Sequence, residues 1–408
     1  MLSPLKPNAA MPMKDRKIVL GVTGSIAAYK AADLCSRLVR AGAQVDVIVT
    51  ENATRFVGAA TFAALTQRQV ITGLYENNSQ LNIDHVELAS KTDVIVIAPA
   101  TANTIAKIAN GISDDALGAT ILATKAPVII APAMDGNMFN NQATQHNVAT
   151  LMSRGLFIAG PAEGRLASGI VGTGRVLETE ELLGVLAMTL GKNGDLEGKH
   201  IVVSAGGTQQ DIDSVRSIKN KSSGKMGYAV AEAARDRGAS VTLISAETNL
   251  ANLVGVHTIK IHSAIEMQQQ LQLETPEADA VIMAAAVADW RPENPSNVKV
   301  KKRTSDKWFV ELTKNPDIIA GIKKDKLIKV GFAAESEDLI ENATYKITQK
   351  NLDFIVANNI NEANSGFGTD TNKVTIIDAD GTLEKLPLMS KYEVGNAILD
   401  RVKTGFHN

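Results

Sequence analysis

The sequence is poor in cysteine, in aromatic residues and in net charge, and it has no long apolar run. Its 408 residues include one cysteine, Cys35, which excludes a disulfide framework and a cysteine-based metal site. Aromatic residues make up 4%, and the net charge of −2 at pH 7 gives no basic surface for nucleic acid. No uninterrupted apolar run reaches the roughly 18 residues of a membrane-spanning helix. We therefore expect a cytoplasmic protein that acts on small molecules, with no nucleic-acid or membrane partner.

The length and the apolar pattern predict two α/β domains, since a domain usually contains about 150 residues. Short β-branched runs alternate with helical patterns, which is typical of doubly wound parallel sheets. In the first half we expect strands at 17–22, 44–49, 93–98 and 127–131, and helices at 26–41, 101–110 and 140–154. In the second half we expect strands at 199–204, 240–245, 279–284, 328–332 and 353–357, a helix at 224–237, and the start of a hairpin at 373–378.

The pattern stops around residues 190–199, where Gly191-Lys192-Asn193-Gly194-Asp195 is polar and rich in turn residues. We place the domain boundary there. The predicted organisation is a flexible leader over 1–16, a first α/β domain over 17–190, a linker over 191–198 and a second α/β domain over 199–408. Ligands of such sheets bind beyond the carboxyl ends of the strands, so the segments that follow the strands should contain the active sites.

In the first half, three segments at strand ends suit a flat ligand that bears a phosphate. Gly24-Ser25-Ile26 follows the first strand, where the free N–H groups at a helix start can bind a phosphate. Thr101-Ala102-Asn103-Thr104 follows another strand and offers small residues and hydroxyls. The loop Met134-Asp135-Gly136-Asn137-Met138 follows the next one. His85 lies at an expected helix start, where a lone histidine is more often a cap or a surface residue.

Together these segments resemble the flavin-dependent cysteine decarboxylases over nearly all of residues 15–180. In that family FMN is bound between the subunits of a trimer and oxidises a cysteine thiol to a thioaldehyde, after which CO₂ leaves. The resemblance implies that His85 is the active-site base and that Asp135 binds or orients the substrate carboxylate. The residues implied for FMN are Gly24, Ser25, Ile26, Thr101, Ala102, Asn103 and Thr104.

Two residues depart from the pattern of that family. Asp135 stands where members often have asparagine, and a carboxylate that faces a substrate carboxylate is unfavourable unless it is protonated or hydrogen-bonded. Many members have a cysteine in a mobile flap for the final reduction, whereas segment 166–175 has Ser168 as its catalytic candidate. Serine is far less acidic than cysteine and is a poorer proton source. An alternative therefore stays open, in which the first domain binds flavin but its decarboxylase is impaired.

The second half has lysines and an acid in the segments that follow its strands. Residues 220–227 lead into a helix but lack GxxxxGK[ST], so they are not a P-loop. Asp289 lies at the end of a wholly apolar predicted strand, where an acid is costly without a partner. Lys299 begins a basic run over 299–302. Lys346 and Lys350 lie one helical turn apart and share a helix face.

These segments, with 285–289, 315–318 and 331–335, closely resemble phosphopantothenate–cysteine ligase over about residues 195–400. The resemblance implies that 4′-phosphopantothenate attacks the α-phosphate of CTP and that the amine of cysteine then displaces CMP from the acyl-cytidylate. Lys299 and Mg²⁺ would stabilise the α-phosphate, and Asn220 would hold the acyl intermediate. The residues implied for CTP are Met283, Ala284, Ala285, Asp289, Lys299, Pro316, Asp317, Ile318, Ile319, Phe332, Lys346 and Lys350. Asp289 and the CTP phosphates are the candidate ligands of Mg²⁺, and the residues themselves give no reason for cytosine rather than adenine.

The order of the two halves is informative, because in bacteria this ligase is commonly fused behind the decarboxylase. The resemblance thus implies a bifunctional enzyme of coenzyme A biosynthesis, with a flavodoxin-like domain followed by a Rossmann-like domain. The family's flavin domains form trimers and its ligase domains form dimers, and both symmetries together would give a homo-oligomer of twelve chains. A two-domain NAD dehydrogenase is disfavoured, because neither half has GxGxxG with an acid about 20 residues later.

Overall fold

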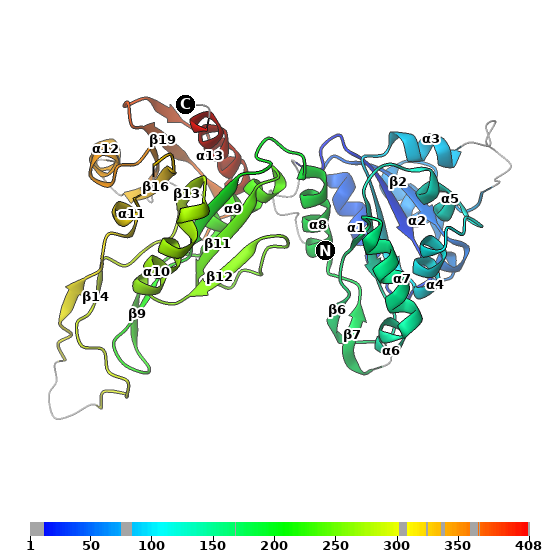
Figure 1. Ribbon diagram of the computed structural model, residues 1–408, viewed down its shortest axis with the longest axis horizontal. Coiled ribbons are helices and arrows are strands. Elements are labelled where there is room, and N and C mark those ends of the chain that lie inside the picture. The colour runs from blue at the N-terminus through cyan, green and yellow to red at the C-terminus, as the bar shows by residue number, and fades with distance from the viewer. Residues whose placement is uncertain are drawn as a thin grey trace. The chain divides into compact units, whose positions relative to one another are not determined.

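The computed structural model describes residues 12–74, 84–167, 169–301, 308–323, 325–335, 339–359, 366 and 368–406. It divides into two compact units, of which the first ends at Leu190 and the second begins at Gly191 (Figure 1). This division falls in the stretch where the strand and helix pattern of the sequence stops. Ser168 lies outside the described residues. Within these ranges, no helix combines the length and the apolar content that crossing a membrane requires.

The N-terminal unit is built on a five-stranded parallel sheet with the order β2-β1-β3-β4-β5. Its strands are β1 (Lys17–Val22), β2 (Gln44–Val49), β3 (Val94–Ala100), β4 (Val128–Pro132) and β5 (Phe157–Ile158). This is the strand order of the flavodoxin-like fold, in which the order reverses between β1 and β3. β3 is buried along its whole length, which explains its uninterrupted apolar sequence.

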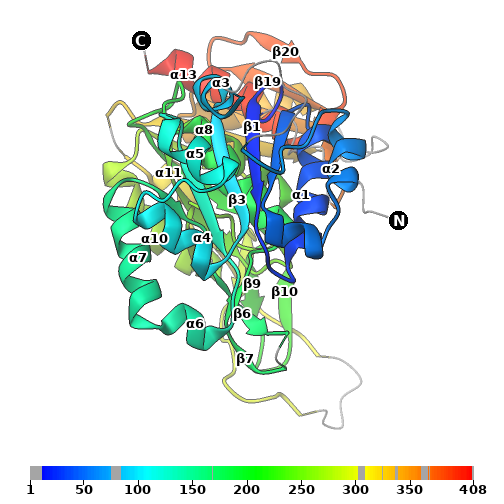
Figure 2. The ribbon, with the colours of Figure 1, turned by 90° about the vertical axis from the view of Figure 1, so that its right-hand side faces the viewer.

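Helices cover both faces of this sheet (Figure 2). They are η2 (Glu51–Arg55), α1 (Ala28–Arg40), α2 (Ala59–Thr66), α3 (Asp84–Lys91), α4 (Ala102–Ala109), α5 (Ala116–Ala123), α6 (Gly136–Asn140), α7 (Gln142–Ser153) and α8 (Thr179–Gly191). α1 and α2 lie on one face, and α4, α5 and α7 pack against the other around Ile95 and Ile97. An antiparallel hairpin of β6 (Ala162–Arg165) and β7 (Val171–Arg175) follows β5. Met13 is buried and the Asp15 N–H donates to the Gly42 carbonyl, so the last residues of the expected leader pack against this unit.

The C-terminal unit is built on an eight-stranded sheet with the order β12-β11-β8-β13-β16-β17-β19-β20. Its strands are β8 (His200–Ala205), β11 (Ser240–Ala246), β12 (His257–Ile261), β13 (Ala280–Met283), β16 (Ile328–Glu335), β17 (Phe354–Asn359), β19 (Val374–Asp378) and β20 (Leu383–Lys385). The first six strands in this order are parallel, and β19 and β20 continue the sheet antiparallel, which confirms the expected hairpin. Six parallel strands in this order are the Rossmann arrangement, with its switch point between β8 and β13.

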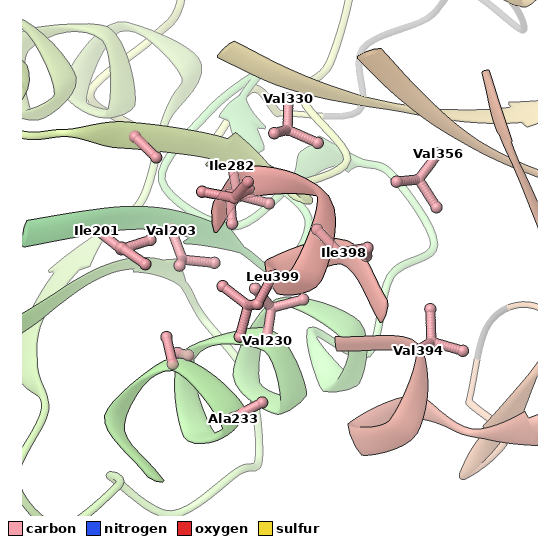
Figure 3. Packing of buried hydrophobic residues seen from close by; sticks show 14 of the residues in the cluster. Ile201, Val203, Val230, Ala233, Ile282, Val330, Val356, Val394, Ile398 and Leu399 are labelled. Carbon is pink, nitrogen blue, oxygen red and sulfur yellow. The ribbon is translucent and has the colours of Figure 1, made fainter. Parts of the chain in front are cut away.

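Two helical layers enclose the core of this unit. The helices are α9 (Lys225–Asp236), α10 (Ala264–Glu274), η3 (Thr275–Glu277), α11 (Ile318–Gly321), α12 (Leu339–Lys350) and α13 (Lys391–Gly405). α9 and α13 cover one face, where Figure 3 shows Val230 and Leu399 near Val203 of β8, and α10, α11 and α12 cover the other. Gly227 of α9 allows a close approach to β8, because a Cβ there would lie 2.6 Å from the Ala205 Cβ.

Short antiparallel pairs extend from the C-terminal sheet. They are β9 (Gln209–Asp211) with β10 (Ser217–Lys219), β14 (Trp290–Pro292) with β15 (Leu312–Lys314), and β18 (Thr371–Asn372) with β21 (Met389–Ser390). All three pairs lie outside the expected strand and helix pattern. They connect the core strands to the segments that line the second cavity described below.

Candidate active sites

The N-terminal site lies at the switch point between β1 and β3. Thr23, directly after β1, is buried, and its hydroxyl donates to the Pro99 carbonyl at 2.8 Å and accepts from the Thr101 N–H at 3.1 Å. Thr101 caps α4, because its Oγ1 accepts from the Thr104 N–H at 3.2 Å. These bonds hold the ends of β1 and β3 together at the point where the fold leaves a crevice.

The loop after β1 leads directly into α1. A Cβ at Gly24 would lie 2.6 Å from the Asn52 Cβ, so only glycine fits between the loop and the segment after β2. The Ser25 hydroxyl accepts from the Ala27 N–H at 3.3 Å, and α1 begins at Ala28. Ser25 and Ile26 line a cavity of about 640 Å³. Gly24 and the segment Thr101-Ala102-Asn103-Thr104 support this end of the sheet without lining that cavity.

The opposite wall of this cavity comes from the loop after β4 and from the β6–β7 hairpin. Met134 and Asp135 line it together with Leu166, Ala167 and Arg175. Asp135 caps the short helix α6, since its Oδ1 accepts from the Asn137 N–H at 3.0 Å. Gly174 allows the hairpin to approach the loop, because a Cβ there would lie 2.1 Å from the Met134 carbonyl oxygen. The Met134 N–H donates to the Gly174 carbonyl at 3.0 Å across this contact. The predicted flap segment therefore packs against the predicted Asp135 loop.

His85 lies elsewhere in the N-terminal unit. It is the second residue of α3, which packs against α5, and it does not line the cavity. The expected helix start at this position is confirmed. The structure therefore brings together Ser25, Ile26 and Asp135, but it does not bring His85 to them within one chain.

The second site is a cavity of about 620 Å³ at the carboxyl ends of the C-terminal sheet, next to β13 and β16. It is lined by almost every residue that the ligase resemblance assigns to CTP. Those that line it are Met283, Ala284, Ala285, Asp289, Pro316, Asp317, Ile318, Ile319, Phe332, Lys346 and Lys350. Lys346 and Lys350 share one face of α12, as expected, and the Lys350 ammonium lies 3.1 Å from Asp317 Oδ2.

The expectation that Asp289 lies at the end of an apolar strand, and so needs a partner there, is wrong. β13 already ends at Met283, and the intervening residues form an irregular loop in which Asp289 is exposed. An exposed carboxylate keeps its hydration and has no desolvation penalty to offset. Asp289 is therefore free to face a ligand in this cavity.

Neither Asn220 nor Lys299 lines this cavity. The Asn220 side-chain amide donates to the Val287 carbonyl at 3.0 Å, so it is bonded to a loop that lines the cavity. Lys299 is exposed, and its neighbour Val300 is held by two hydrogen bonds. The Val300 N–H donates to Asp213 Oδ2 at 3.1 Å, and Arg216 Nη2 donates to the Val300 carbonyl at 2.7 Å. The turn between β9 and β10 therefore anchors the Lys299 segment.

Two lysines at one end of the cavity were not among the predicted site residues. Lys225 is the first residue of α9 and donates to Asp370 Oδ1 at 2.8 Å, and Lys391 is the first residue of α13 and donates to the Gly366 carbonyl at 3.0 Å. Burial first, and then the nearby charge of Lys225, lower the pKa of Lys391 to about 8. The Ser-Ser-Gly-Lys segment that ends in Lys225 is a sequence signal for that lysine. Lys391 follows the two-residue strand β21, and no motif in the sequence indicates its place in the cavity.

Comparisons with known proteins agree with this division. The family model described as "Flavoprotein" matches residues 8–191, and that described as "DNA/pantothenate metabolism flavoprotein C-terminal domain" matches residues 196–406. The chain is 44% identical over 395 residues to the coenzyme A biosynthesis bifunctional protein CoaBC of Bacillus subtilis (strain 168), covering 96% of this chain and 97% of the relative. It is 38% identical over 401 residues to the protein of that name from Escherichia coli (strain K12), covering 97% and 98%. A solved structure of the C-terminal domain of such a protein is 38% identical and covers 52% of this chain and 97% of its own, with a TM-score of 0.45.

Proposed function

The chain belongs to the family of bifunctional coenzyme A biosynthesis proteins, and we propose that it ligates 4′-phosphopantothenate to cysteine with CTP and then decarboxylates the product with FMN. The observation that supports this most is the second cavity, because residues assigned to CTP from separate segments line it together. The ligase product, 4′-phosphopantothenoylcysteine, is the substrate of the decarboxylase. The reading as a ligase with an impaired decarboxylase is not favoured.

The residues around the first cavity fit FMN. α1 begins at Ala28, and the residues Ser25 and Ile26 that lead into it line the cavity, so the positive end of the helix dipole can face the flavin phosphate. The small residues Ala27 and Ala133, which also line the cavity, leave room for a flat ring. The remaining FMN contacts are assigned to Gly24, Ile26 and the segment 101–104. When bound, FMN supplies an acceptor for the two electrons that leave the substrate. Asp135 orients the substrate within the cavity, where its Oδ1 accepts from the Asn137 N–H and holds the carboxylate at the start of α6.

We assign the proton acceptor for the substrate thiol to His85 of a neighbouring copy of the chain. His85 does not line the cavity of its own chain, and a site between subunits would bring it to the cavity of another. This assignment requires a homo-oligomer, and the trimer of the decarboxylase family is the arrangement that we propose. Twelve chains would combine it with the ligase dimer.

In the second cavity, a carboxylate oxygen of 4′-phosphopantothenate attacks the α-phosphorus of CTP, and pyrophosphate leaves. The amine of cysteine then attacks the acyl carbon, and CMP leaves. Lys299 stabilises the negative charge that develops on the α-phosphate, and Asn220 holds the acyl group. Two hydrogen bonds support these roles. The Asn220 side chain is bonded to Val287 in the wall of the cavity. The backbone of Val300, next to Lys299, is bonded to Asp213 in the turn between β9 and β10.

Asp289 and the CTP phosphates are the proposed ligands of Mg²⁺, which supplies positive charge to the triphosphate. Among the described residues no three acidic, histidine or cysteine side chains are grouped as a metal site. This fits Mg²⁺, which is usually bound through one or two carboxylates together with substrate phosphates. We also propose a cytoplasmic location, which stays a prediction from the sequence.

The experiment that tests this function supplies the purified chain with 4′-phosphopantothenate, cysteine, CTP and Mg²⁺ and measures pyrophosphate and CO₂. We expect both products and a flavin absorbance. Lys299→Gln should stop pyrophosphate release, whereas Asn220→Asp should let the acyl-cytidylate accumulate. A colourless protein that binds nicotinamide would overturn the proposal for the first domain. Normal turnover by Asn220→Asp would overturn the role of Asn220.

A further inference from the structure

Three cationic side chains line the N-terminal cavity, and none of them has a role in the proposed chemistry. Lys30 lies on the first turn of α1, Arg165 ends β6, and Arg175 ends β7. They come from segments on two sides of the cavity. Asp135 is the one acidic residue among the residues that line it.

In the β6–β7 hairpin, the Arg175 guanidinium of β7 lies against Gly164 of the neighbouring strand β6. Ala162 is the residue paired with Arg175, and Gly164 lies further along β6. A Cβ at Gly164 would lie 2.6 Å from Arg175 Nη1, so a glycine at this position leaves the room that the guanidinium occupies. Arg175 is half-buried there and lines the cavity.

Lys30 and Arg175 are held together by one carboxylate. The Lys30 ammonium lies 2.9 Å from both oxygens of Glu178, and Arg175 Nη2 lies 2.8 Å from Glu178 Oε1. Two cations therefore share one anion, which leaves an excess of positive charge. Glu178 is exposed and does not itself line the cavity, so it positions the two cations from outside.

Arg165 has a different environment, because it is exposed and makes no ion pair within the described part of the chain. Its strand leads directly into Leu166 and Ala167, which line the same cavity. With Asp135 and Glu178 included, the charges at the cavity still sum to a positive value. An arginine with five donors and no carboxylate partner suits a phosphate, which it can bind with two parallel hydrogen bonds.

We propose that Arg165, Arg175 and Lys30 form a binding site for a phosphate monoester, and that its occupant is the 4′-phosphate of the decarboxylase substrate. A phosphate monoester has a charge of about −1.5 to −2 at pH 7, which the excess cations complement. The position of Arg165 and Arg175 on the hairpin, beside the flap residues, favours the substrate. The flavin phosphate has the same chemistry and is the other source to be distinguished. The proposal rests on the decarboxylase function proposed above.

The test compares CO₂ release by the full-length protein from 4′-phosphopantothenoylcysteine and from its dephosphorylated form, pantothenoylcysteine. Arg165→Gln and Arg175→Gln should each lower kcat/KM for the phosphorylated substrate by about 10- to 100-fold, as expected when a hydrogen bond to a charged group is lost. The dephosphorylated substrate should be affected less than threefold or so. Arg40→Gln, at the opposite end of α1, is the matched control and should leave both values unchanged. Retention of FMN and of riboflavin is measured for each variant.

The outcomes separate the two phosphate sources and the underlying function. A loss confined to the phosphorylated substrate supports the proposal. Weaker retention of FMN than of riboflavin, with equal effects on both substrates, would overturn the substrate assignment and give the site to the flavin phosphate. No change, or an equal fall for both substrates with normal flavin retention, would overturn the phosphate site itself. If the unaltered protein releases no CO₂ from either substrate, the decarboxylase function has failed instead.

Discussion

Replacing Gly174 with alanine should disable the decarboxylase and leave the ligase intact. A Cβ at this position would lie 2.1 Å from the Met134 carbonyl oxygen, whereas real Cβ atoms essentially never come within 3.0 Å of a heavy atom outside their own and the adjacent residues. The hairpin and the Asp135 loop must therefore separate by about 1 Å, and a misplacement of that size can lower a rate about 100-fold. The φ of +153° at Gly174 adds strain for any other residue. We expect kcat/KM for CO₂ release to fall by about this factor.

The matched control is Gly172→Ala on the same strand, where the nearest atom to a Cβ would be Leu166 Cδ1 at 4.0 Å. It should keep its rate of CO₂ release to within about twofold, since it introduces no clash. Pyrophosphate release by the C-terminal unit provides a second control within each variant, and flavin absorbance reports whether the first domain has folded. Normal CO₂ release by Gly174→Ala, or equal losses in both variants, would refute the idea that this close approach builds the site.

Four further results are expected. Gly207→Ala would put a Cβ 2.4 Å from the Asn220 carbonyl oxygen. Pyrophosphate release should therefore fall at least about tenfold, while CO₂ release from supplied 4′-phosphopantothenoylcysteine is unchanged. Equal losses in both assays would contradict this. Leu399→Ala should lower the free energy of unfolding by about 2–5 kcal/mol, against about 0.5 kcal/mol or less for the half-exposed Leu388→Ala, in urea titrations. Burial lowers the pKa of Lys391 from 10.5 to about 8, so between these values the unfolded chain binds more protons than the folded one. The stability of the unaltered protein relative to Lys391→Met should therefore rise with pH across that window, and a constant difference would be the contrary result. Removing Mg²⁺ with EDTA should stop pyrophosphate release and leave CO₂ release from supplied substrate unchanged.

The parallel strands and their helices could be predicted from the sequence because they are buried. Each expected strand and helix begins within two residues of its position in the structure. β3 is apolar at every position, and α9 is rich in alanine with Gly227 against β8, so burial and close packing both left a pattern in the sequence. The segments after these strands were therefore located correctly, and those of the second domain converge on one cavity.

The prediction failed where short elements or irregular loops set the environment of a residue. Asp289 was placed at a strand end, but the strand stops at Met283 and the loop that follows exposes the carboxylate. Lys391 becomes a buried cavity residue only because β18 and β21 pair and fix the start of α13. Pairs of two or three residues are too short for a period to be recognised in a sequence.

The antiparallel hairpins have a common relation to the two cavities. In the first domain, the hairpin of β6 and β7 is seen in Figure 1. Its residues Arg165 and Arg175 line one cavity with residues that follow the parallel strands. In the second, the turn between β9 and β10 anchors Val300 and leads on to Asn220. The carboxyl ends of parallel sheets are where ligands of such folds bind, and many unrelated enzymes share this arrangement. In the roles that we propose, the hairpins supply or anchor the groups that the particular substrates require, so substitutions in them should alter substrate selectivity while substitutions in the sheet alter stability.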